Sequence, residues 1–128
     1  MAVPFAAKWY SPCLVLAAIC VLSAGCDRSA RSLSLDEARA REVCTRFLEA
    51  WRDGRQPADL KPEITGRDHQ WLSGKKLVSF ELLPEETSDG TNLHIPVQLT
   101  LEAGDGKEVT STALYVVGTS PVVTVFRD

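Results

Sequence analysis

From Ser34 to Asp53 the chain places apolar and polar residues at the spacing of an amphipathic helix. Apolar residues recur every three or four positions and therefore fall on one stripe: Ala40, Val43, Cys44, Phe47, Leu48 and Trp51. Ser34 and Glu37 have the spacing of a capping box, in which each side chain bonds a free backbone N–H at the helix start. Gly54 follows the stripe, where a left-handed residue commonly ends a helix. The pattern predicts one long helix with a single buried side.

Beyond Leu77 the apolar period falls to two, which is the spacing of strands. The clearest case is 92–101, where apolar side chains occupy every second position: Leu93, Ile95, Val97, Leu99 and Leu101. Turns rich in Gly and Asp separate further strands at 77–82, 109–117 and 122–126. We therefore expect an α+β domain in which the long N-terminal helix packs on a curved, four-stranded antiparallel meander.

The strand faces follow from the register that the turns impose. Pairing Leu101 with Val109 extends the apolar face of 92–101 onto the next strand, and a two-residue turn would then pair Val117 with Val122. This register puts a second apolar cluster on the face away from the helix: Leu114, Val116, Val123 and Val125. Such a cluster needs a cover, either the connection around Trp71 or another molecule. We predict that it is an interface.

A helix followed by an antiparallel meander is the element order of the cystatin-like and NTF2-like architectures, which residues 34–128 resemble. The chain matches no catalytic motif of those families, so the resemblance implies no catalytic residue. It does imply a cone between helix and sheet, and the residues expected at such a pocket are Trp51, Asp68, His69 and Trp71. Asp68 and His69 are the most enzyme-like pair, but an Asp in a connection rich in Gly and Pro also forms turns.

The N-terminal residues 1–25 have the pattern of an export signal. Lys8 precedes an uninterrupted apolar run at 13–22, which is short for a membrane span and typical of a signal-peptide core. An ordinary secretory signal or an uncleaved anchor would show the same run.

The residues that follow the run resemble a bacterial lipobox, in which Leu and two small residues precede the cysteine that is acylated. Ala24, Gly25 and Cys26 match, and Ser23 stands where Leu is usual. The implied organisation is a lipoprotein signal peptide at 1–25, a lipidated Cys26 with a short polar tether to residue 33, and one domain at 34–128. The end of the chain, Tyr115 to Asp128, is also similar to that of small bacterial lipoproteins.

Charge and cysteine content narrow the function classes. The net charge of the 128-residue chain is −3, and removal of Lys8 with the signal makes it more negative, which argues against nucleic acid as a partner. If Cys26 carries lipid, Cys44 is the single cysteine left, and its place on the apolar stripe indicates a core thiol. The two histidines and the acidic turns lack the spacing of metal ligands, and no motif indicates a cofactor.

Two functions remain open on these grounds. One is a non-enzymatic interaction or structural module of the bacterial cell envelope, exported, held to the membrane by its lipid, and paired with a second copy or with an envelope protein. The other is a small NTF2-like enzyme or ligand carrier with a pocket between helix and sheet. A polar-lined cavity would favour the second function, and a filled core would favour the first.

Overall fold

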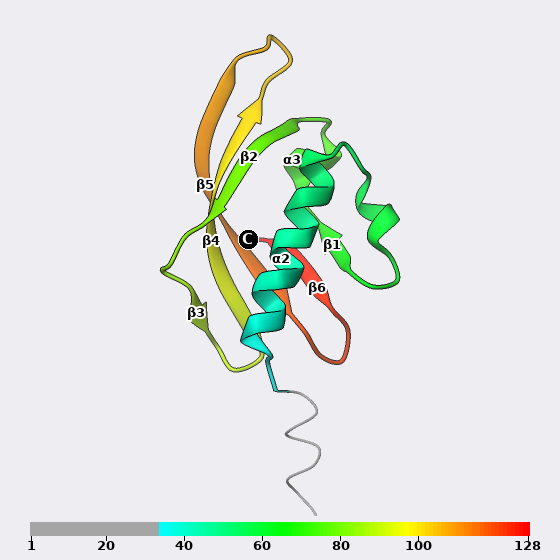
Figure 1. Cartoon of the computed structure of the whole chain (residues 1–128), viewed down its shortest axis with the longest axis vertical. Helices are drawn as coiled ribbons and strands as arrows, with labels where there is room; N and C mark the ends of the chain where they lie inside the picture. The colour runs from blue at the N-terminus through cyan, green and yellow to red at the C-terminus, as the bar shows by residue number, and fades with distance from the viewer. Residues whose placement is uncertain (1–33) are drawn as a thin grey trace, which may run out of the picture.

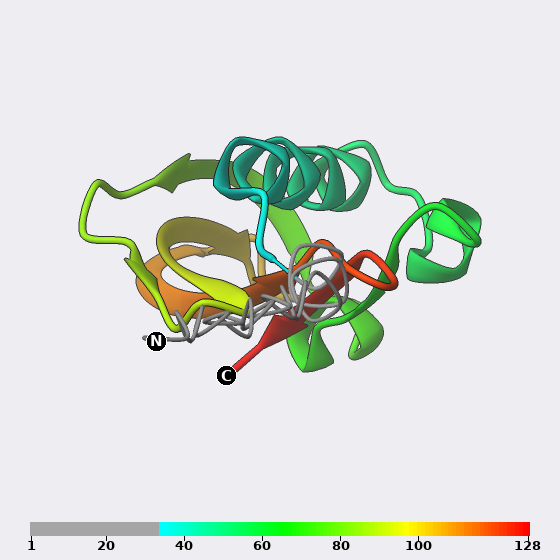
Figure 2. The same cartoon turned by 90° about the horizontal axis from the view of Figure 1, so that it is seen from below.

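The computed structural model describes residues 34–128, which form an α+β domain with one long helix and a curled, mixed sheet (Figure 1). The predicted signal peptide and Cys26 lie outside the described residues. The elements in chain order are α2 (Glu37–Arg52), the 3₁₀ helix η1 (Pro57–Leu60), β1 (Thr65–Arg67), α3 (His69–Leu72), β2 (Lys76–Leu82), β3 (Thr87–Ser88), β4 (Asn92–Glu102), β5 (Glu108–Gly118) and β6 (Thr124–Arg127). Figure 2 shows α2 lying across the sheet on one side.

The helix α2 confirms the predicted stripe, with Ala50 added to its buried residues, but its start differs. Asp36 is the N-cap, and its carboxylate accepts from the Arg39 N–H at 3.0 Å. The backbone N–H of Asp36 donates to Thr119 Oγ1 at 3.1 Å, so this loop residue takes the place that a capping-box Glu would fill. Gly54 has the expected left-handed conformation, with φ +78°.

The sheet has more strands than predicted and is not wholly antiparallel. Its order is β1-β6-β5-β4-β2, with the two-residue β3 paired to β4, and β1 runs parallel to β6. The four predicted strands do form an antiparallel meander. Strand β1 was missed because its three residues are too few to show a period of two.

The register between β5 and β6 corrects the predicted interface. Val117 pairs with Val125 instead of Val122, because the loop between the strands holds five residues (119–123) and not two. The shift of three positions exchanges the faces of the last strand. Val123 and Val125 are therefore core residues, 9% and 0% exposed, whereas Phe126 faces outward beside Val116.

The hairpin of β4 and β5 has the predicted register. Leu101 pairs with Val109, and the ladder continues to a pair of facing carboxylates, Glu102 and Glu108. In Figure 1 this hairpin projects past the end of α2. Val109 faces the helix side of the sheet but is 57% exposed, since no element covers that end.

Aromatic side chains fill the space between helix and sheet. The Phe47 ring lies edge-on to two other rings. The distance between ring centroids is 5.1 Å to Trp71 and 6.3 Å to Tyr115. Phe47 also packs directly over Gly66 of β1, where a Cβ atom would lie 2.2 Å from its ring. The centre of the cone is therefore filled by side chains of the chain itself.

Candidate functional site

The predicted site residue Asp68 is buried in the core edge, 1% exposed. It is the N-cap of α3, and its Oδ1 accepts from the backbone N–H groups of Gln70 at 2.7 Å and Trp71 at 3.2 Å. Its Oδ2 accepts from the Tyr115 hydroxyl at 2.5 Å. Arg127 completes the group, with Nη1 at 3.6 Å from Oδ1. One carboxylate thus joins α3, β5 and β6.

The environment of Tyr115 fixes the direction of this contact. Burial, and then the bond to Asp68, raise the pKa of the Tyr115 hydroxyl far above its ordinary value of 10. The hydroxyl therefore stays protonated and remains a donor. Neither group has a free lone pair or proton aimed at open space, which is what a general base or acid requires.

The two predicted pocket tryptophans stack on each other. Their ring centroids are 5.8 Å apart and the rings are nearly parallel. Each indole N–H donates to a backbone carbonyl oxygen: Trp51 to that of Lys75 at 2.8 Å, and Trp71 to that of Arg55 at 2.9 Å. The pair braces the loop after α2 against the turn after α3. The stacking occupies one face of each ring, and both rings also line a shallow space of about 180 Å³ together with Arg55 and Lys75.

His69 does not join the other predicted residues. Its side chain is exposed, and its Nε2 lies 3.2 Å from Nε2 of Gln70. The structure therefore brings Trp51, Asp68 and Trp71 together as packing and capping groups, and it leaves His69 at the surface.

Three residues that the sequence did not single out surround a small cavity instead. Gln70 of α3, Lys75 before β2 and Arg127 of β6 line a space of about 150 Å³ against two hairpin residues, the buried Leu101 and the exposed Val109. Gln70 Oε1 and Arg127 Nη1 are buried and lack a hydrogen-bond partner among the described residues. The sequence held no signal for this site, because the register predicted from it placed Val125, and with it Arg127, on the outer face.

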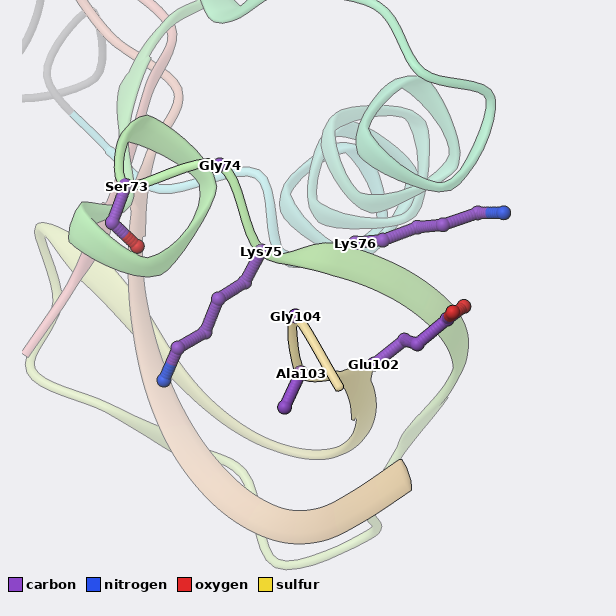
Figure 3. A pocket seen from close by; sticks show the side chains of 7 residues that line it. All are labelled: Ser73, Gly74, Lys75, Lys76, Glu102, Ala103 and Gly104. Atoms are coloured by element: carbon purple, nitrogen blue, oxygen red, sulfur yellow. The ribbon is translucent and has the colours of Figure 1, made fainter. Parts of the chain in front are cut away.

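An open groove of about 590 Å³ lies next to the cavity and shares two lining residues with it, Lys75 and Ala103. Figure 3 shows Lys75 pointing away from Lys76 and Glu102. The two lysine side chains therefore point in different directions, and of the two it is Lys75 that lines the cavity.

The outer face of the sheet, away from α2, carries the second feature. Phe126 is 43% exposed, and Leu114 and Val116 beside it are half-buried. A groove of about 410 Å³ runs next to Phe126 and is lined in addition by Leu72, itself 54% exposed, and by Lys61 and Arg67. We call Leu114, Val116 and Phe126 the outer patch.

Other chemistry is not indicated in the part of the chain that the structure describes. Residues 34–128 contain no group of three or more His, Cys, Asp or Glu side chains arranged to hold a metal ion. Cys44 is buried, and burial raises the pKa of its thiol to about 12. Within the same residues no helix is long and apolar enough to cross a membrane.

The helix and the curled mixed sheet are compatible with an NTF2-like fold. No family model matches the chain, and neither a curated protein nor a solved structure matches it.

Proposed function

We propose that this protein is a membrane-tethered, non-enzymatic interaction module of the bacterial cell envelope, and that it pairs with a second copy of itself through the outer patch. The observation that carries the proposal is the exposure of Phe126 beside Leu114 and Val116. Apolar side chains that gather on a sheet face, rather than standing singly, commonly mark a protein–protein contact.

The charges around the outer patch favour a second copy as the partner. On the outward face, Arg67 pairs with Phe126 at the β1 edge, whereas Glu102 and Glu108 face each other at the hairpin end. In a two-fold pair the same surface is used by both copies, so the basic edge of one copy can meet the acidic end of the other. A face with both charge signs is therefore self-complementary.

The filled core supports a non-enzymatic role over a small NTF2-like enzyme. Asp68 is the most enzyme-like carboxylate of the predicted pocket, and three hydrogen bonds already occupy it. Phe47, Trp71 and Tyr115 close the space in which a substrate would meet it. A general base without access to substrate supplies no catalysis.

The test is the solution mass of the chain from Ser29 onward, which omits the predicted anchor, measured by sedimentation equilibrium. We expect a concentration-dependent dimer for the native sequence and a monomer for Val116→Lys, because a buried unpaired ammonium opposes association. Ser111→Lys, on the opposite face of the same strand, is the matched control and should dimerise. A native chain that stays monomeric at high concentration, or a control that dissociates equally, would refute pairing through this face.

A further inference from the structure

The groove beside β1 offers apolar contacts that nothing within residues 34–128 uses. Its space of about 410 Å³ is bordered by Leu72 and Phe126, which are 54% and 43% exposed. Pro57 and Ala58 of η1 form part of the remaining wall. Exposed apolar side chains that gather around a hollow, rather than standing singly, favour contact with a partner.

The strand β1 adds backbone groups to this groove. It is the last strand of the sheet and pairs with β6 on one side (Figure 1). The N–H of Thr65 donates to the carbonyl oxygen of Val123 at 3.0 Å, and alternate residues of a parallel strand bond to the same neighbour. The N–H and C=O of Gly66, which lines the groove, therefore point to the open edge. Open strand edges accept a further strand.

The charges around the groove select an acidic partner. Lys61 and Arg67 are exposed and line the groove, and its lining residues include no Asp or Glu. Neither cation forms an ion pair within residues 34–128, whereas Arg41 and Arg46 of α2 both do. Carboxylates on a partner would compensate both charges. The same two cations would repel the β1 edge of a second copy, which argues against edge pairing between copies.

We propose that this groove binds an extended acidic segment of another protein, which adds as a strand to the free edge of β1. The segment's backbone pairs with Gly66, and its carboxylates face Lys61 and Arg67. Its apolar side chains contact Leu72 and Phe126. The proposed pairing uses the face of the sheet and this contact uses its edge, so the inference goes beyond the pairing and stands without it.

The experiment is a fluorescence-polarisation titration with the full-length chain in detergent. The probe is the labelled peptide Gly-Glu-Glu-Val-Val-Glu-Gly-amide, which as a strand carries Glu and Val on both faces, and the matched probe has Gln in place of each Glu. We expect a dissociation constant on the order of 100 µM for the acidic peptide and about tenfold weaker binding of the Gln peptide, because the charge-assisted bonds are lost.

A third probe tests the addition of a strand. It is the acidic peptide with a methyl group on both Val nitrogens, one of which must face β1 in a strand. A methylated nitrogen cannot donate to the Gly66 carbonyl oxygen, so we expect binding to weaken about tenfold. Equal affinity of the methylated and unmethylated peptides would refute strand addition.

Two arginines provide the control for charge on the protein. Arg67→Gln should weaken binding of the acidic peptide about tenfold, whereas Arg39→Gln, the same change at an exposed position on α2, should leave it unchanged. Both positions are exposed, so both variants should fold. Absence of binding at about 1 mM protein, roughly tenfold above the expected constant, would overturn the inference, as would equal losses in the two variants.

One variant separates this site from the proposed pairing, since Phe126 borders both surfaces. Val116→Lys, which should not pair, should still bind the acidic peptide. If the peptide does not bind and Arg67→Gln abolishes self-association, the groove belongs to a second copy and the inference is wrong. A native chain that is monomeric and binds the peptide would refute the pairing and support this site.

Discussion

At the scale of single residues, Asp68 shows how a residue with enzyme-like chemistry serves the fold. An isolated carboxylate would be costly to bury, but this one accepts two backbone N–H groups and the Tyr115 hydroxyl. The bond from Tyr115 crosses 47 positions of sequence, so it fastens α3 to the middle of the sheet. Its removal should therefore affect stability.

We expect Tyr115→Phe to lower the free energy of unfolding by about 1–3 kcal/mol, because Asp68 Oδ2 would remain buried without its donor. Urea unfolding of the variant, of Asp68→Asn and of the double variant forms a cycle that isolates the pair. Additive losses in the double variant would show that the two groups do not interact.

Gly66 is the second residue whose role is steric. A Cβ atom there would lie 2.2 Å from Cε2 of Phe47 and 3.0 Å from the Val125 carbonyl oxygen, and the buried ring has little room to move. We expect Gly66→Ala to cost about 1–3 kcal/mol through overpacking. Gly104→Ala is the control, since no atom lies within 4 Å of its Cβ position, and its melting temperature should stay near that of the native chain.

At the scale of elements, α2 is held at its sides as well as through its stripe. Arg41 of the helix forms a bidentate contact with Glu86 in the connection between β2 and β3, and it also lies 3.4 Å from Glu37. At the helix start, Asp36 is bonded to Thr119 of the β5–β6 loop. These contacts orient a helix that hydrophobic burial alone would leave free to slide, because burial is not directional.

The Arg41 contact makes stability depend on pH. The hydrogen bond from Arg41 lowers the pKa of Glu86 below its ordinary value of 4.5. A carboxylate whose pKa is lower in the folded state contributes stability above its unfolded pKa and loses it as the pH falls. We expect Glu86→Gln to be less stable than the native chain at pH 7 and to lose less stability between pH 5 and about pH 3.

Urea midpoints measured across that range provide the test. Glu85→Gln, at the exposed neighbouring position, is the control and should follow the native curve. Parallel curves for the native chain and Glu86→Gln would contradict a contribution from the Arg41 contact. Both partners are partly exposed, so added salt should reduce the difference.

At the scale of the whole molecule, the described chain has two opposite ends. The N-terminal end of α2 lies far from the tip of the β4–β5 hairpin (Figure 1). Eight extended residues reach about 28 Å at most. If Cys26 carries the lipid, a tether of this length keeps the start of the domain within about 28 Å of the membrane surface.

We expect Cys26→Ser to release the protein from the membrane fraction and to abolish incorporation of labelled palmitate, because each buried methylene of an acyl chain contributes about 0.8 kcal/mol to membrane binding. Fractionation of cells and autoradiography of the immunoprecipitated protein measure the two effects. Cys44→Ser is the control and should keep both the label and the location. A Cys26→Ser protein that stays wholly membrane-bound would show that the lipobox was misassigned.

The features that depend on local periodicity could be predicted from the sequence. The stripe of α2 and the alternation along β4 follow from neighbouring residues, and so does the pairing of Leu101 with Val109 across a short turn. The class of fold, a helix on an antiparallel meander, could be predicted from these elements alone. Each is set by contacts within about ten residues, which is the range that a sequence pattern reports.

The faces of β6, the parallel strand β1 and the residues that line the cavity depend on contacts between distant parts of the chain. The sequence does not show whether the loop before β6 has two residues or five. The loop in the structure has five, and this length places Val123 and Val125 in the core. The cavity joins Gln70, Lys75 and Arg127 across 57 positions, and no local pattern encodes that meeting. Long-range packing fixes such positions, because the buried area of the whole core, and not the preference of any segment, selects the register.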